Sequence, residues 1–308
     1  MLMSKKLYSR IQEKKKKLDS LRPLNKFQLS KIKEQLEIEY IYNSTSIEGN
    51  TLTLNETRMV LQEGITIGRK SLREYLDVTN QKEALTWIEE FIKKKKKDIK
   101  ETDILILHKI TLKGISDYWA GRYKTSQNRI LGSKLKTTPP YKVHNEMQNL
   151  VYLINKNPNK YNIVELAAIA HHELVRIHPF VDGNGRCARL LTNLILMRTG
   201  YPPIIIKNKD RKKYFDVLEK AHFGDLRPFV NFIAQLTDSA LMAYLSALVP
   251  TTKETELLPL KVLAKETPYS QEYLSLLARR GVISAVKING VWNSTREEIK
   301  RYLESIKR

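Results

Sequence analysis

The chain is organised around one stretch of twelve residues, His178-Pro-Phe-Val-Asp-Gly-Asn-Gly-Arg-Cys-Ala-Arg189. An apolar, helix-forming segment, residues 190–197, follows it directly. A glycine turn that leads into a helix exposes unpaired backbone N–H groups at the positive end of the helix dipole, and such a turn binds anions. Arg186 and Arg189 are three residues apart, so both can reach phosphate oxygens from the first turns of that helix.

Two more side chains of this stretch carry chemistry. Asp182 is a carboxylate that can hold a divalent cation against phosphate oxygens. His178 is an imidazole, the side chain whose ordinary pKa suits proton abstraction near neutral pH. The stretch therefore predicts a nucleotide polyphosphate held by its tail, with a base beside it.

Three other motifs fit these residues less well. Gly183-Asn-Gly-Arg-Cys-Ala188 matches the dinucleotide fingerprint, but that motif follows a strand, and residues 165–177 read as a helix. The sequence contains no Walker loop. His172-Glu173 opens a zinc-binding His-Glu-x-x-His motif, yet Arg176 stands in place of the second histidine. The histidines of this helix are therefore expected to pack and hydrogen-bond in the core.

The stretch resembles the Fic-family signature His-x-Phe-x-(Asp/Glu)-Gly-Asn-Gly-Arg-x-x-Arg at every defined position. Ser44-Thr-Ser-Ile-Glu-Gly49 is similar to the inhibitory motif of this family, and its position indicates the class whose inhibitory helix precedes the Fic domain. The resemblance covers about residues 35–240. Gly121-Arg-Tyr123 and Gly224-Asp-Leu-Arg-Pro-Phe229 look like the same stretches of the animal endoplasmic-reticulum Fic enzyme.

The resemblance implies an enzyme, a protein adenylyltransferase that transfers AMP from ATP to a Ser, Thr or Tyr hydroxyl of a target protein and releases pyrophosphate. The implied roles are proton acceptor for His178, Mg²⁺ ligand for Asp182, and ATP-phosphate binding for Gly183, Asn184, Gly185, Arg186 and Arg189.

The resemblance also implies autoinhibition. Glu48 is expected to pair with Arg189 and so remove the cation that the γ-phosphate needs. Ser44 lies one turn earlier on the same helix face. The alternative for Glu48 is a capping carboxylate near a helix end. Some members of this class also remove AMP, with the same glutamate aligning a water, so both reactions stay open.

Tyr214, Phe215 and His222 lie where the family lines its adenine pocket. His222 departs from the asparagine that is common there. The alternative for Tyr214 and Phe215 is that they are ordinary core aromatics.

The periodicity of apolar residues predicts a mainly α fold, a Fic-type helical core. Residues 121–140 read as a short β-hairpin flap, in which Thr125, Ile130 and Leu131 would align the target protein by strand addition. Helices are predicted over about residues 27–47, 54–63, 72–93, 101–113, 143–155, 163–177, 189–198, 211–223 and 227–248.

The C-terminal part resembles a winged helix-turn-helix. Short helices at 260–265 and 271–280 precede two strands, Val282-Ile283 and Val291-Trp292, around the turn Asn289-Gly290, and a last helix follows. The expected domains are an N-terminal helical region with the inhibitory helix (1–115), a Fic catalytic core with the flap (116–248), a linker (249–257) and the winged-helix-like domain (258–308).

The bulk properties set further limits. The 308 residues carry a net charge of +21, which favours anionic partners. Cys187 stands alone, so no intrachain disulfide forms, and a reducing compartment fits. Residues 1–10 lack the apolar region of a signal peptide, and no stretch approaches a membrane-spanning length, so a cytoplasmic protein without a membrane contact is expected.

Other functions stay open. The second hypothesis is a nucleotide-sensing regulator that binds DNA through residues 258–308, with Arg279, Arg280 and Lys287 on phosphates. The same segment could instead mediate protein contacts. The transferred group could also be UMP or a phosphorylated choline. A homodimer is common in the family, and Leu72 is a candidate contact.

Overall fold

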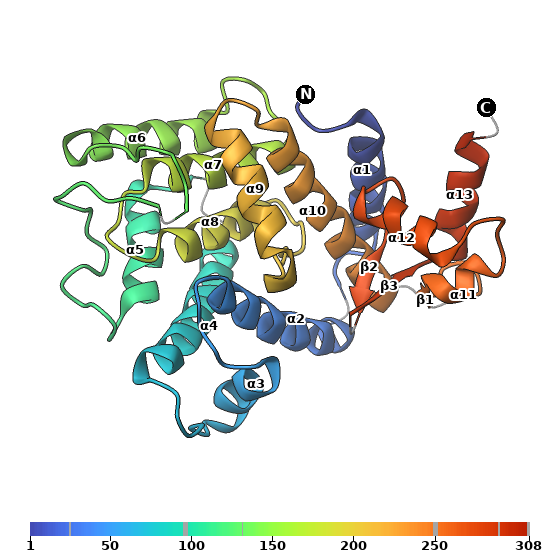
Figure 1. Ribbon diagram of the computed structural model, residues 1–308, viewed down its shortest axis with the longest axis horizontal. Helices are drawn as coiled ribbons and strands as arrows, with labels where there is room; N and C mark the ends of the chain where they lie inside the picture. The colour runs from blue at the N-terminus through green and yellow to red at the C-terminus, as the bar shows by residue number, and fades with distance from the viewer. Residues whose placement is uncertain (25, 95–97, 131, 249–251, 289, 307–308) are drawn as a thin grey trace. The chain divides into compact units, whose positions relative to one another are not determined.

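The computed structural model describes residues 1–24, 26–94, 98–130, 132–248, 252–288 and 290–306. The protein is mainly helical, as the sequence predicts, with one small antiparallel sheet among these residues (Figure 1). It forms two compact units. The first consists of Met1–Leu2 and Glu34–Ile233, and the second of Met3–Lys33 and Ala234–Arg308.

The first unit contains most of the helices, and two of them, α2 and α10, have residues in both units. In chain order the elements are α2 (Lys26–Ile47), α3 (Leu54–Glu63), α4 (Leu72–Lys93), α5 (Glu101–Leu112), α6 (Pro140–Lys156), α7 (Ile163–Ile177), α8 (Asn184–Arg198), the 3₁₀ turn η1 (Asn208–Asp210), α9 (Arg211–His222) and α10 (Arg227–Leu248).

Helices α7 and α8 form the centre of this unit. Most of their residues are buried, and in α8 these include the polar Arg186, Arg189 and Asn193. Helix α8 contacts α4, α5 and α7, and α7 also contacts α6 and α9 (Figure 1). The signature is therefore the turn that joins the two central helices.

The expected helices are present, with differences at their ends. The capping box at the start of α3 is confirmed, since the Glu56 N–H donates to Thr53 Oγ1 at 3.2 Å and the Thr53 N–H donates to Glu56 Oε2 at 2.7 Å. Helix α8 begins at Asn184, five residues before the predicted start, so both signature arginines lie on the helix. Helix α6 begins at Pro140, because proline at the first position costs no hydrogen bond.

The expected flap hairpin is shorter than predicted. Among the described residues of 121–139, pairing is limited to one antiparallel bridge, Arg129 with Lys136. Thr125 is exposed and Ile130 is half-buried, whereas Leu131 lies outside the described residues. The segment is an extended loop around a single bridge.

The second unit combines the N-terminal helix with the C-terminal elements. These are α1 (Lys5–Ser20), β1 (Leu258–Pro259), α11 (Leu260–Ala264), α12 (Gln271–Arg279), β2 (Val286–Ile288), β3 (Val291–Ser294) and α13 (Arg296–Ile306). The antiparallel sheet has the order β1-β3-β2. Helices, hairpin and final helix follow in the expected order, and the DNA-binding type of winged helix stays a prediction.

The first strand of the C-terminal hairpin lies later in the chain than the sequence predicts. The first strand of the hairpin is Val286–Ile288 rather than Val282-Ile283, which lies in the turn after α12. The register shows the difference, since Ile288 pairs with Val291. Asn289, expected in the hairpin turn, lies outside the described residues.

The unit boundaries also differ from the expected ones, because α1 belongs with the C-terminal elements. Its apolar stripe is buried, and its Arg10 guanidinium donates to the carbonyls of Gly281 and Val282 at 3.0 Å each. Arg10 also pairs with the buried Asp238 at 2.9 Å. These contacts fix α1 within the second unit, and no local sequence pattern reports them.

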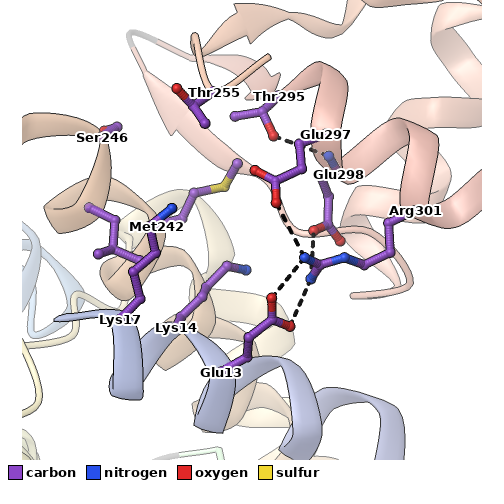
Figure 2. A pocket seen from close by; sticks show the side chains of 11 residues that line it. Glu13, Lys14, Lys17, Met242, Ser246, Thr255, Thr295, Glu297, Glu298 and Arg301 are labelled. Carbon is purple, nitrogen blue, oxygen red and sulfur yellow. Dashed lines mark hydrogen bonds and ion pairs between the residues drawn. The ribbon is translucent and has the colours of Figure 1, made fainter. Parts of the chain in front are cut away.

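A cavity of about 100 Å³ lies in this second unit, beside α1 and α13. Arg301 and Glu13, two of the lining residues, point toward each other and approach to 2.9 Å (Figure 2). Glu297 and Glu298 also reach the Arg301 guanidinium, at 3.5 and 3.8 Å. The lining carries both signs of charge and contains no signature residue.

A search of the described helices for a membrane-crossing segment gives a negative result, because none is both long and apolar enough.

Candidate active site

The signature loop is bounded by two residues with left-handed backbone. His178 follows α7 with φ of +50°, and Gly183 caps the start of α8 with φ of +78°. Glycine adopts this conformation freely, whereas histidine does so at a cost in strain. Strain of this kind is typical of functional sites, where the surrounding structure holds a side chain in a required direction.

The hydrogen bond of His178 sets the state of its ring. Nδ1 lies 3.3 Å from the Val175 carbonyl oxygen. Because a carbonyl only accepts, we assign the ring proton to Nδ1, which leaves a lone pair on Nε2. Burial lowers the pKa of His178 to about 4, so the ring is neutral at physiological pH. A neutral imidazole with a free Nε2 is competent to accept a proton.

The Asn184 side chain bonds within the loop. Asn184 Oδ1 accepts from the Phe180 N–H at 3.0 Å, and Asn184 Nδ2 donates to the Phe180 carbonyl at 2.8 Å. Both ends of the amide are therefore used inside the loop, and the residue is buried. In this state the Asn184 side chain shapes the turn, and ATP-phosphate binding by this residue stays a prediction.

His108 of α5 supports the loop, and the sequence reasoning missed it. Its ring stacks on Phe180 with centroids 3.6 Å apart. The Gly121 N–H donates to Nδ1 at 3.0 Å, so Nε2 carries the proton and donates to the Asp182 carbonyl at 2.9 Å. Burial lowers the pKa of His108 to about 4, consistent with this neutral form. Phe180 is fully buried, so its ring anchors the loop in the core.

Arg189 is held by the segment that was expected to inhibit it. Its Nη2 lies 2.8 Å from Glu48 Oε1 and donates to the Ser44 carbonyl at 2.8 Å. Its Nε donates to Ser44 Oγ at 3.0 Å. The predicted ion pair is therefore present, and Ser44 contributes two contacts of its own. The capping alternative for Glu48 does not describe this carboxylate, because it is bound to a side chain of another helix.

The Glu48 carboxylate also lies against the first turn of α8. A Cβ atom built on Gly185 would be 2.3 Å from Glu48 Oε1 and 3.2 Å from Arg189 Nη1. Glycine at this position therefore permits the carboxylate to approach. Positive dipole charge and unpaired N–H groups gather at such a helix start. Glu48 thus places an anionic group where the sequence predicts phosphate binding.

Helix α4 supplies two further site residues that sequence reasoning missed. Asp77 pairs with Arg186, whose side chain is 3% exposed. One turn earlier, Arg73 pairs with Asp182 at the surface, and Asp182 Oδ1 also lies 3.3 Å from Arg186 Nη2. These four side chains alternate in charge. Arg186 therefore has carboxylate partners in this state, as Arg189 has in Glu48.

Replacing Asp77 with asparagine is expected to destabilise the protein by about 3 kcal/mol, because the buried Arg186 loses its closest counter-charge. The expected fall in Tm is roughly 6–10 °C, measured by calorimetry. Asp225→Asn removes an exposed aspartate–arginine pair and serves as the matched control, with little change expected. Equal Tm values for the two variants would contradict the assignment.

The three residues expected at the adenine pocket lie on α9 and differ in exposure. Tyr214 is a core residue, as the alternative had it, since it is 1% exposed and its hydroxyl lies 2.8 Å from His171 Nε2. Phe215 is 36% exposed, with the Arg211 guanidinium 4.8 Å above its ring. His222 is half-buried. Phe215 and His222 are thus more exposed than Tyr214, and an adenine pocket at the three residues stays a prediction.

The flap is attached to both the signature and α9. The Lys124 N–H donates to the Pro179 carbonyl at 2.8 Å, and Asn128 Nδ2 donates to the Phe180 carbonyl at 2.8 Å. At the other end, Ser133 Oγ donates to Glu219 Oε2 at 2.6 Å. The loop therefore borders the space next to the signature.

Two buried helices are joined by a glycine turn that begins with His178, and Arg186 and Arg189 lie in the first turns of the second helix. A model of the Fic/DOC family matches residues 98–196. A protein adenylyltransferase Fic from Nematostella vectensis is 36% identical over 246 residues, 80% of this chain and 57% of that protein. Protein adenylyltransferase fic-1 from Caenorhabditis elegans is 39% identical over 211 residues, 68% of this chain and 41% of that protein.

Among solved structures, a Fic domain containing signaling protein from Bacteroides thetaiotaomicron is 31% identical, with a TM-score of 0.71. The match covers 79% of this chain and 100% of that one. The chain belongs to the Fic/DOC family. It spans about half the length of the curated relatives it matches.

Proposed function

We propose that the protein is a protein adenylyltransferase, an enzyme that moves AMP from ATP to a hydroxyl of a target protein, and that it rests in an inhibited state. The observation that carries the proposal is the Glu48 carboxylate, which lies on Arg189 and against Gly185, at the anion-binding start of α8. The names of the relatives, protein adenylyltransferases, support the reaction class.

In the proposed reaction, Nε2 of His178 accepts the proton of the target hydroxyl while its oxygen attacks the α-phosphorus of ATP. The new O–P bond forms as the bond to pyrophosphate breaks, and pyrophosphate takes the leaving electron pair. Arg186 and Arg189 hold its oxygens and offset the charge that develops there. Arg189 does so only after Glu48 has left it. Positioning and charge stabilisation supply most of the acceleration.

Mg²⁺ fits the residues that are present. Burial would raise the pKa of Asp182, but Arg186, the Gly183 N–H and Arg73 outweigh burial and lower it, so the carboxylate is ionised. One carboxylate together with phosphate oxygens is a usual magnesium environment. Asp182 would hold the ion, whose charge would offset that of the phosphates, and the surface contact with Arg73 would give way to it.

For the protein substrate, we propose that the flap aligns the target segment by backbone pairing. The flap is attached to Phe180 and to Glu219, and these attachments support the proposal. They keep the segment around Thr125 and Ile130 next to His178, the proposed proton acceptor. Removal of AMP by the same site, transfer of UMP or phosphocholine, DNA binding by residues 258–308 and a cytoplasmic location stay predictions of the sequence. Dimerisation also stays a prediction of the sequence. Leu72, its candidate contact, is 72% exposed.

The test uses ATP labelled at different phosphates. Glu48→Gly protein incubated with ATP labelled on the α-phosphate should acquire covalent label, whereas label on the γ-phosphate should stay in solution. Label transferred from the γ-phosphate would indicate a phosphoryl transfer instead and would overturn the proposal.

The pH dependence of transfer follows from the pKa of His178. Burial lowers this pKa to about 4, and the ring must be neutral to accept a proton. In Glu48→Gly protein we therefore expect kcat/KM to stay level from pH 8 to pH 6 and to fall as the pH approaches 4. An acid limb centred at the ordinary histidine value, about 6.5, would contradict the assigned environment of the base.

A further inference from the structure

Lys124, at the start of the flap, is a buried cation that the proposed mechanism does not use. The residue is 3% exposed, although lysine is almost never fully buried unless an acidic group pairs with it. Among the residues that the structure describes, no carboxylate forms an ion pair with its ammonium. The positive charge of Lys124 is therefore without a counter-charge in this part of the chain.

The hydrogen bonds of the ammonium go to neutral acceptors in the flap. Lys124 Nζ donates to Asn128 Oδ1 at 2.6 Å and to Thr137 Oγ1 at 3.2 Å. Each acceptor also has a second donor. Thr137 Oγ1 lies 2.9 Å from Asn128 Oδ1, and Gln127 Nε2 donates to Thr137 Oγ1 at 2.7 Å. These acceptors would therefore keep a hydrogen bond without Lys124.

Burying this charge costs stability. An ammonium loses its hydration on burial, and apolar side chains of similar volume are often neutral or stabilising where they replace a buried charge. Packing and hydrogen bonding within the flap thus give no reason for a cation at Lys124. Residues that cost stability in this way are typical of functional sites, where the charge acts on a ligand.

The backbone places this charge beside the proposed base. The Lys124 N–H donates at 2.8 Å to the carbonyl of Pro179, the residue after His178. The charge acts on the imidazole. Burial is the main cause that lowers the pKa of His178, the charge of Lys124 lowers it further, and the charges of Glu48 and Asp182 raise it. In the proposed reaction, the α-phosphate meets the target hydroxyl next to this same imidazole.

We propose that Lys124 is a positioning residue for the transfer, a buried positive charge that draws the α-phosphate of the nucleotide toward His178. The phosphate supplies the negative charge that the ammonium lacks. Arg186 and Arg189 hold the pyrophosphate end, so Lys124 gives the transferred phosphate a cation of its own. The inference rests on the proposed function, since it concerns the same nucleotide.

The test measures the affinity of AMP, whose single phosphate is the α-phosphate, by isothermal titration in Glu48→Gly protein at pH 7. Lys124→Met should weaken AMP binding by roughly 5–30-fold, the effect of one charge several Å from a phosphate in a partly buried site. Lys124→Arg, which keeps the charge, should retain most of the affinity. Lys136→Met removes an exposed lysine of the same flap and is the control, with unchanged affinity expected.

Thermal stability separates this role from a structural one. Lys124→Met should leave Tm unchanged or raise it, because an apolar chain replaces a buried charge. The rate of AMP transfer should fall in the same variant and recover in Lys124→Arg. A lower Tm together with unchanged AMP affinity would show that Lys124 only ties the flap, and it would overturn the proposal.

The unsubstituted lysine allows a second test that does not depend on the folding of a Lys124 variant. Burial lowers the pKa of Lys124 to about 8, so its charge is present below pH 8 and is lost above it. In Glu48→Gly protein, AMP affinity should therefore fall from pH 7 to pH 9, at and beyond the upper end of the range in which the His178 profile is level. An arginine stays charged over this range, so Lys124→Arg should show no such fall. Level affinity with Lys124 intact would contradict the proposal.

The outcomes distinguish this inference from the proposed function. If Glu48→Gly protein binds no adenine nucleotide and transfers no label, the proposed function fails. If it transfers AMP, but Lys124→Met binds AMP as tightly as the protein that keeps Lys124, the proposal for Lys124 is overturned while the transferase assignment stands.

Discussion

Replacing Glu48 with glycine is expected to raise the rate of AMP transfer by roughly 10–100-fold. The change removes the carboxylate that neutralises Arg189 and lies against Gly185, so the guanidinium and the start of α8 become available to the phosphates of ATP. Couplings of this kind between a regulatory contact and a ligand are typically 5–150-fold. The measurement is the initial rate of label transfer from ATP labelled on its α-phosphate, at saturating and at limiting nucleotide.

Glu63→Gly is the matched control for this prediction. It makes the same substitution at an exposed helix end, where no contact with a signature residue is present. The rate of this variant should equal that of the unchanged protein. The rate of Glu48→Gln should lie between the rates of the unchanged protein and of Glu48→Gly. An amide can keep a hydrogen bond with Arg189 but has no negative charge. Unchanged transfer in Glu48→Gly would contradict autoinhibition by this residue.

The second large effect is expected at the proposed base. In the Glu48→Gly background, His178→Ala should lower kcat by about 10²–10⁴-fold, the usual contribution of general base catalysis. Affinity for ATP should change little, because within the described residues the hydrogen bond of the His178 ring goes to the α7 backbone. Isothermal titration with a non-hydrolysable ATP analogue measures the affinity, and single-turnover kinetics measure the rate.

His144→Ala provides the control for that prediction, since it removes an exposed imidazole of α6 whose hydrogen bonds go to Glu101 and Gln148. Its rate should match the background variant. Transfer that persists in His178→Ala would show that another group accepts the proton, and a parallel loss of ATP affinity would indicate a collapsed loop rather than a missing base.

The parts of the site that sequence predicts are those carried by short, continuous motifs. The signature places His178, Asp182 and both arginines within one turn and the helix that follows it. Ser44 and Glu48 form a second local motif. The positive dipole charge at the start of α8 explains why an acidic residue lies near it. These residues are recognisable because their spacing along the chain already determines their geometry.

Residues that reach the site from other helices give no such signal. Arg73 and Asp77 of α4 and His108 of α5 are single polar residues in ordinary amphipathic helices. Nothing in their own neighbourhood indicates that they pair with a loop some hundred residues later. The same holds for Arg10, whose partners Gly281 and Val282 are found only in the folded second unit.

Two other features of the structure, the burial of Tyr214 and the hydrogen bonds of Asn184, can be foreseen from the sequence. Tyr214 shares a helical stripe with Val217, Leu218 and Ala221, all buried, so its burial follows from the 3.6-residue period. Asparagine in a tight turn commonly bonds to nearby backbone, as Asn184 does to Phe180.

The central claim is that Glu48 restrains the site through Arg189, and a double-mutant cycle tests it most directly. The rate of AMP transfer is measured for the unchanged protein, Glu48→Gly, Arg189→Met and the double variant. The account predicts a large gain from Glu48→Gly when Arg189 is present and almost none when Arg189 is methionine. An equal fold-gain in both backgrounds would contradict it, because Glu48 would then act without the arginine it binds.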